Sequence, residues 1–66
     1  MKIVVNNQDK IIEESQTITS LLAQMNIDPK GLAVAINTNV IPSIHWEGTF
    51  FKEKDQVTLI RATQGG

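Results

Sequence analysis

The chain has 66 residues, 41% of them hydrophobic, and a formal net charge of −1. A chain this short buries only about 60% of the surface that its unfolded form exposes, so it can form one economical core and has little apolar material left to line a deep substrate cleft. The near balance of charge argues against a nucleic-acid binder, which would show a basic face. Because the chain has no cysteine, it has no disulfides and none of the usual cysteine-based metal sites.

No segment of the sequence predicts a targeting signal or a membrane span. The longest purely apolar run, residues 32–36, is far shorter than the roughly 20 residues that cross a bilayer. Residues 1–6 lack the long apolar run of a signal peptide. We therefore expect a soluble, cytoplasmic protein that binds neither a membrane nor nucleic acid.

The first segments of the chain predict a β-hairpin. Residues 1–5 are rich in β-branched side chains and alternate, with Ile3 and Val5 on one face. Residues 6–9 are polar, and their Asn and Asp side chains favour a turn. Residues 10–13 are then predicted to form a second short strand.

The clearest periodicity follows and predicts a helix of about ten residues, because apolar side chains recur at positions i, i+3, i+4 and i+7. This stripe consists of Ile18, Leu21, Leu22 and Met25. Thr17 or Ser15 can serve as the N-cap, while Asn26 suits the C-terminal end and Pro29 prevents continuation. A helix this short is marginal in isolation, so its apolar stripe must pack on a sheet.

Three more strands are expected in the second half of the chain. Residues 32–36 are continuously apolar, which is typical of a central strand covered on at least part of both faces. Residues 40–41 predict a short strand after a polar turn. Residues 56–62 predict the last strand, with Val57 and Leu59 on one face.

The segment between the last two strands is the least regular part of the sequence. Ser43 could cap a helical turn that carries Trp46 and ends at Gly48. Residues 52–55 are all charged, and we expect them to form a solvated turn.

The order of the expected elements predicts the fold class. Strands interrupted by one good helix indicate an α+β fold, with the helix packed across one face of a mixed sheet of four to five strands. Residues 1–66 are expected to form a single domain. Residues 63–66 are expected to form a flexible C-terminal tail, because they carry no apolar side chain that could pack.

No side-chain cluster in the sequence points to catalysis. His45 is the only histidine, and a lone histidine without cysteine cannot build a typical zinc site, so we expect a surface or half-buried structural histidine. The aromatic side chains Trp46, Phe50 and Phe51 could form a binding platform, although aromatic residues more often fill the core. We therefore expect these aromatic side chains to lie in the core, with one of the two phenylalanines partly exposed. The sequence predicts no catalytic residue and no metal site.

The terminal pair Gly65-Gly66 is the feature that points to a function. Glycine has no Cβ, so such an end can enter a narrow channel and adopt backbone angles closed to other residues. A terminal carboxyl has an ordinary pKa of about 3.3–3.7, and it is therefore an anion and a poor electrophile at neutral pH. It becomes reactive only when another protein activates it, for instance as an acyl-adenylate made from ATP. Such a chain needs a body for recognition and a slim end, but no catalytic residue of its own.

Several segments spread over the full length together match a known pattern. They are residues 1–6, 17–22, 32–37 and 55–60, the run Val40-Ile41-Pro42 followed by Trp46, and the terminal Gly65-Gly66. With these segments the chain resembles the sulfur carrier proteins of thiamine biosynthesis, the ThiS family, which have the ubiquitin-like β-grasp fold.

The resemblance implies a carrier protein and not an enzyme. It implies that an adenylating enzyme of the ThiF type, related to ubiquitin-activating enzymes, converts the Gly66 carboxylate to an acyl-adenylate with ATP and magnesium. Sulfur from a persulfide donor then displaces AMP, and a thiazole synthase of the ThiG type uses the resulting C-terminal thiocarboxylate to build the thiazole ring. Gly66 is thus the expected site of adenylation and sulfur attachment, with Gly65 and Gln64 in the tail. No cofactor is expected to stay bound, since the acyl-adenylate and the thiocarboxylate are transient.

The resemblance also implies a docking surface. Carriers of this fold usually dock through the sheet face that the helix does not cover, close to the tail. Ile60, Arg61 and Ala62 are the candidates for this docking surface. It is an equally good interpretation that Ile60 is buried in the core and that Arg61 is simply exposed to solvent.

Three other functions stay open at this point. The chain could be a molybdopterin-type sulfur carrier, although its short length and residues 37–42 favour the thiamine branch. It could be a ubiquitin-like modifier that forms an isopeptide bond to lysine. It could also be a non-catalytic β-grasp binding module whose terminal glycines have no role.

Overall fold

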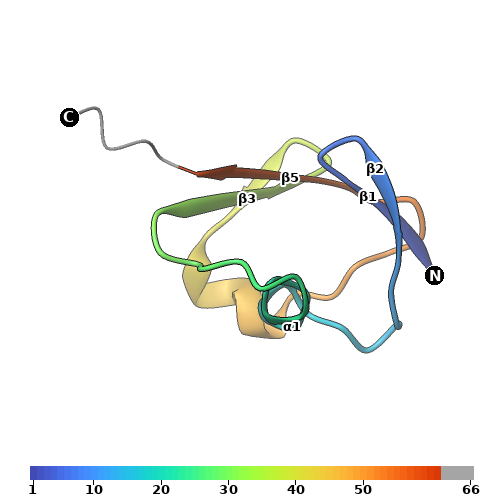
Figure 1. Ribbon diagram of the computed structural model, residues 1–66, viewed down its shortest axis with the longest axis horizontal. Helices are drawn as coiled ribbons and strands as arrows, with labels where there is room; N and C mark the ends of the chain where they lie inside the picture. The colour runs from blue at the N-terminus through green and yellow to red at the C-terminus, as the bar shows by residue number, and fades with distance from the viewer. Residues whose placement is uncertain (62–66) are drawn as a thin grey trace.

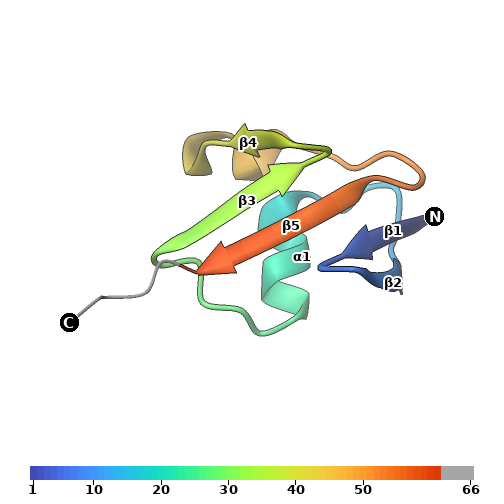
Figure 2. The ribbon, with the colours of Figure 1, turned by 90° about the horizontal axis from the view of Figure 1, so that it is seen from above.

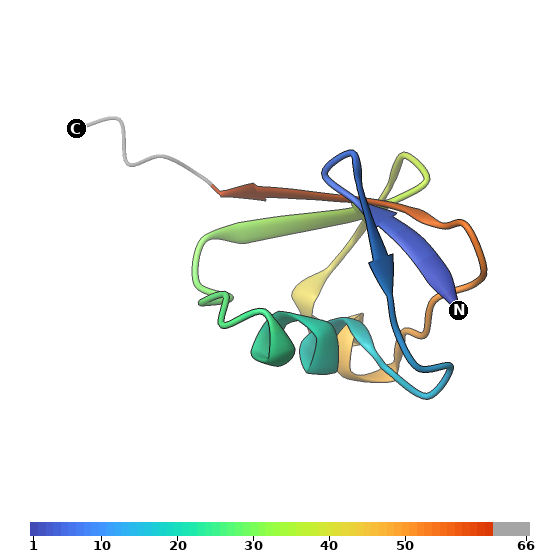
Figure 3. The same ribbon diagram turned by 45° about the vertical axis from the view of Figure 1, so that its right-hand side comes forward.

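A computed structural model describes residues 1–61; the five residues that follow lie outside the described part of the chain. The elements are β1 (Lys2–Val5), β2 (Gln8–Ile11), α1 (Ile18–Gln24), β3 (Leu32–Ile36), β4 (Asn39–Ile41), the 3₁₀ helix η1 (Ser43–Gly48) and β5 (Gln56–Arg61). The strands form one mixed sheet, and α1 and η1 lie on the same side of it (Figures 1 and 3). The predicted α+β fold, with one main helix across one face of the sheet, is confirmed.

The sheet has the strand order β2-β1-β5-β3-β4. The pair β1–β5 is parallel, and the other neighbouring pairs are antiparallel. The middle strand is therefore β5, and β3, which was expected to be a central strand, is paired along both of its edges. The sequence does not reveal that β5 is the middle strand. Both backbone edges of β5 are paired, but one of its faces is open to solvent and carries the polar residues Gln56 and Thr58.

Both hairpins turn on two residues in the left-handed region. Asn6 and Asn7 have φ angles of 49° and 69°, and Asn37 and Thr38 have 51° and 76°. Such turns match the right-handed twist of the flanking strands, and asparagine tolerates them better than most residues. The first turn is shorter than predicted, so β2 begins at Gln8 and not at residue 10. The first residues of β2, Gln8 and Asp9, are polar because β2 is an exposed edge strand, and their polarity therefore predicted a longer turn.

Helix α1 covers the inner face of the sheet. It begins after Thr17, whose Oγ1 accepts a hydrogen bond from the Ser20 N–H at 3.2 Å, so Thr17 and not Ser15 is the N-cap. The helix has seven residues rather than about ten, because Met25 is its C-cap and Asn26 turns the chain with a φ of 57°. The buried hydrophobic side chains from helix, sheet and loops form one core, which consists of Ile3, Val5, Ile12, Ile18, Leu21, Leu22, Val34, Trp46, Phe51 and Val57.

The aromatic residues around η1 complete this core. Trp46 is buried, and its Nε1–H donates to the carbonyl oxygen of Ile41 at 2.7 Å. Phe51 is buried while Phe50 is 56% exposed, which confirms that one of the two phenylalanines lies partly outside the core. Pro42 is the N-cap of η1, with no side-chain cap bond, so the predicted capping by Ser43 is wrong.

Asp55 is buried, with only 7% of its surface exposed, so the solvated turn predicted for residues 52–55 is wrong at its last position. One carboxylate oxygen of Asp55 accepts from Asn37 Nδ2 at 2.9 Å, and the other accepts from the Lys52 N–H at 2.8 Å. Asn37 in turn accepts from the Gln56 N–H at 2.9 Å. These bonds tie the β3–β4 turn to the start of β5.

No helix within residues 1–61 is long and apolar enough to cross a membrane.

The Asp55 cluster generates a stability prediction. Asp55→Ala leaves the Lys52 N–H and the Asn37 amide without their acceptor, and we expect a loss of about 2–3 kcal/mol in the free energy of unfolding. Asp9→Ala is the matched control, because Asp9 is exposed and its ion pair with Lys2, at 3.4 Å, contributes less than about 1 kcal/mol. Urea denaturation measures both. Equal losses for the two variants would contradict a structural role of Asp55.

Candidate functional site

The last strand presents different side chains to the two faces of the sheet. Val57 is buried and Leu59 half-buried on the side of α1, whereas Thr58 and Ile60 are exposed on the opposite side. Figure 2 looks onto that opposite side, with α1 behind the sheet. Ile60 is 60% exposed, so it is not a core residue and is free to contact a partner.

Ile60 has apolar neighbours on the same face. It pairs across the strands with Ala33, and Thr58 pairs with Ala35, which pairs in turn with Val40. Val40 is 70% exposed. We call these five residues the open face. It carries no charged side chain, and contiguous exposed apolar surface of this kind marks interaction sites.

The small residues of β3 belong to the open face and not to the helix contact. Val34 points into the core and is fully buried, so Ala33 and Ala35 point away from α1. Their small size therefore does not serve close approach of the helix. Their short side chains leave a shallow floor between the larger Ile60 and Val40.

Arg61 ends the described part of the last strand. Its Nη1 donates to the carbonyl oxygen of Lys30 and its Nη2 to that of Asp28, both at 2.9 Å. The guanidinium is thus engaged within the chain, so Arg61 is more than a solvated charge. The other predicted site residues, Ala62, Gln64, Gly65 and Gly66, lie outside the described residues, and their roles stay predictions.

Asn6 supports the last strand from the other side, a role that the sequence did not indicate. Strand β1 ends at Val5, and the Asn6 side chain then takes the place of a further strand residue. Its Oδ1 accepts from the Leu59 N–H at 2.8 Å, and its Nδ2 donates to the Leu59 carbonyl oxygen at 3.3 Å. The end of β5 is therefore fixed along both edges as far as Leu59.

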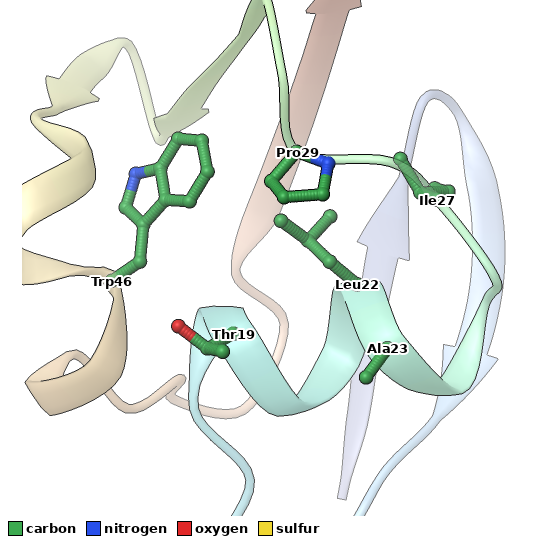
Figure 4. Close-up of a pocket in the computed structure, with 6 residues that line it drawn as sticks. All are labelled: Thr19, Leu22, Ala23, Ile27, Pro29 and Trp46. Carbon is green, nitrogen blue, oxygen red and sulfur yellow. The ribbon is translucent and has the colours of Figure 1, made fainter.

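Residues 1–61 contain no group of three or more His, Cys, Asp or Glu residues placed to hold a metal ion. His45 lies at the surface, as predicted. An apolar hollow of about 240 Å³ lies between α1 and η1, away from the open face (Figure 4). It is lined by Thr19, Leu22, Ala23, Ile27, Pro29 and Trp46. None of these side chains is ionisable, so the hollow holds no acid, base or charged nucleophile.

Comparison with known proteins identifies the chain. The model of the ThiS family matches residues 2–66. The sulfur carrier protein ThiS of Escherichia coli is 32% identical over 66 residues, which are the whole of both chains. The chain belongs to the ThiS family.

The same comparisons confirm the predicted fold and function of this ThiS-family protein. The crystal structure of ThiS from Geobacter metallireducens superimposes with a TM-score of 0.85 at 25% identity, over 100% of both chains. The chain is a sulfur carrier of thiamine biosynthesis with a β-grasp fold, and not a catalyst. A thiazole synthase of Paramagnetospirillum magneticum is 24% identical over all 66 residues, which make up 20% of that protein.

The bridge between Asn6 and β5 generates a second prediction. Asn6→Ala removes both hydrogen bonds to Leu59, so we expect a loss of about 1–2 kcal/mol in unfolding free energy and faster amide exchange at Leu59. Asn7→Ala is the matched control, because Asn7 has the same kind of positive φ but no such bonds to β5. Hydrogen exchange followed by NMR compares the two variants. Equal exchange at Leu59 in both would show that Asn6 does not hold the strand.

Proposed function

We propose that the chain carries sulfur on the C-terminal carboxylate of Gly66, after activation by an ATP-dependent adenylating enzyme of the ThiF type. The observation that carries this proposal is the end-to-end match with a sulfur carrier, since the alignment covers both chains to their last residue. The family match likewise extends through residue 66. These two matches support Gly66 as the residue that presents the carboxylate.

The proposed chemistry needs two steps on that carboxylate. A carboxylate oxygen attacks the α-phosphorus of ATP, pyrophosphate leaves with magnesium, and the acyl carbon becomes an electrophile. The terminal sulfur of a persulfide then attacks this carbon and AMP leaves. A thiol cleaves the resulting acyl disulfide, which yields the thiocarboxylate and a new disulfide. Because the chain has no cysteine, both sulfur groups belong to partner proteins or to small thiols.

The acceptor of the sulfur is proposed to be a thiazole synthase of the ThiG type. The match between the whole chain and one fifth of a thiazole synthase supports this partner, because it places a similar segment within a protein of that activity. No permanent cofactor belongs to the proposal, and ATP and magnesium are bound by the adenylating partner. The cytoplasmic location stays a prediction, as do the single domain over residues 1–66 and the C-terminal tail at residues 63–66.

The open face is proposed as the surface through which these partners dock. It is apolar and uncharged, it is not covered by α1, and it contains Ile60, the neighbour of the last described residue. Buried apolar anchors surrounded by near-neutral contacts dominate binding at such surfaces. Ile60 is the largest side chain of the open face and hence the expected anchor.

The proposed site predicts the effect of removing the last residue. The chain without Gly66 keeps its described body and open face, so we expect it to bind the adenylating enzyme but to support no thiocarboxylate formation. Its carboxylate falls one residue, or about 3.5 Å, short of the position required. ATP–pyrophosphate exchange with the adenylating enzyme from the same genome measures the first step. Undiminished exchange by the shortened chain would contradict the assignment of Gly66.

The open face predicts a difference between two exposed isoleucines. Ile60→Asp is expected to raise the KM of the adenylating enzyme for the carrier at least about tenfold, since it puts a charge into the apolar docking surface. Ile11→Asp is the matched control, because Ile11 is 71% exposed but lies on the edge strand β2, two strands away from β5. We expect it to leave KM unchanged. Equal effects of the two substitutions would rule out the open face as the docking surface.

A further inference from the structure

Arg61 completes the hydrogen bonding of the loop that leads from α1 into β3. The carbonyl oxygens of Asp28 and Lys30 accept from its guanidinium, and that of Pro29, between them, accepts from the Leu32 N–H at 3.1 Å. The Asp28 carboxylate accepts from the Lys30 N–H at 3.0 Å, which shapes the same turn. Three successive carbonyl groups are thus satisfied, two of them by one side chain.

The end of β5 has few other attachments. On the side of β1, the last bonds are those of Asn6 to Leu59. On the side of β3, Arg61 pairs with Leu32, the last pair of that ladder. Figure 2 shows the loop before β3 meeting the end of β5. Beyond Leu59 the strand is therefore held along one edge only, and the guanidinium is the additional attachment.

We infer that Arg61 is a positioning residue, whose guanidinium clamps the end of β5 to the loop at residues 28–30 and so fixes the point from which the reactive carboxylate is presented. The inference rests on the proposed role of Gly66. Arginine suits this task because its planar fork donates to two carbonyl groups at once, which the single ammonium of lysine does not reproduce.

The clamp limits the reach of the carboxylate. Gly66 lies five positions after Arg61, so it can range no more than about 17 Å from a fixed Arg61. If Arg61 leaves the sheet while Ile60 stays paired with Ala33, the free segment starts at Ile60 and this limit grows to about 21 Å. A longer free segment lowers the effective concentration of the carboxylate in the active site of a docked partner.

Steady-state ATP–pyrophosphate exchange with the adenylating enzyme tests this role. For Arg61→Ala we expect kcat to fall about fivefold or more while KM for the carrier stays within about twofold, because docking is intact and positioning is lost. Arg61→Lys keeps the charge but not the fork, and we expect a similar fall. Lys30→Ala is the matched control, because it removes a positive charge from the same loop and leaves the accepting carbonyl in place.

The outcomes separate this inference from its alternatives. A rise in KM with unchanged kcat in Arg61→Ala would overturn the inference and make Arg61 a direct partner contact. Wild-type kinetics in Arg61→Lys would show that charge alone matters. A wild-type chain that is not adenylated would overturn the proposed function itself, whereas an active wild type with an equally active Arg61→Ala would overturn only the clamp.

Amide hydrogen exchange of the free protein gives a readout that needs no partner. In Arg61→Ala and Arg61→Lys we expect exchange at the Ile60 amide to quicken about tenfold, while Val57 keeps its protection and shows that the body is folded. Unchanged exchange at Ile60 in the folded Arg61→Lys variant would contradict the clamp, even if Arg61→Ala fails to fold.

Discussion

The pairing of β5 with both β1 and β3 is the interaction on which the rest of the structure depends. Without β5 the sheet would consist of two separate hairpins, β1–β2 and β3–β4. Two short hairpins are marginal in water, and α1 would have no continuous surface to pack on. The segment that joins the hairpins is also the last strand of the chain. The same pairing that completes the core therefore holds Arg61, the last described residue, in the middle strand of the sheet.

This arrangement separates stability from function. The inner face of the sheet supplies the core, whereas the open face stays apolar, uncharged and uncovered by the helix. A body of this size has little room to enclose a reaction, and the hollow between α1 and η1 carries no ionisable side chain. Under the proposed function the chain needs none, because the adenylating enzyme and the sulfur donor are proposed to supply ATP, magnesium and sulfur. What the body must contribute is a recognisable surface beside a chain end that starts from a fixed point.

Local patterns predicted much of the fold. The stripe of Ile18, Leu21 and Leu22 located α1, Thr17 was among its two expected caps, and the apolar run at residues 32–36 located β3. The family resemblance supplied the function, and the comparisons confirmed it. These signals succeed because each depends on neighbours a few residues apart.

The features that the sequence did not reveal depend on distant partners. Asp55 stands in a charged run that has the appearance of a solvated turn, and its burial follows from an amide 18 positions away. The bonds of Asn6 to Leu59 span 53 positions, and that of Arg61 to Lys30 spans 31. The central place of β5 likewise follows from pairing and not from its own composition. A single sequence does not show which residues far apart in the chain contact each other in the fold.

We propose that the protein performs no chemistry itself and presents its Gly66 carboxylate for the attachment of sulfur. The most direct test is intact-mass spectrometry, with fragmentation, of the chain after incubation with ATP, magnesium, a persulfide donor, a thiol and the adenylating enzyme from the same genome. We expect that one oxygen is replaced by sulfur and that the change lies in the C-terminal fragment that contains Gly66. An unchanged mass, with the enzyme active on another carrier, or sulfur found elsewhere in the chain, would contradict it.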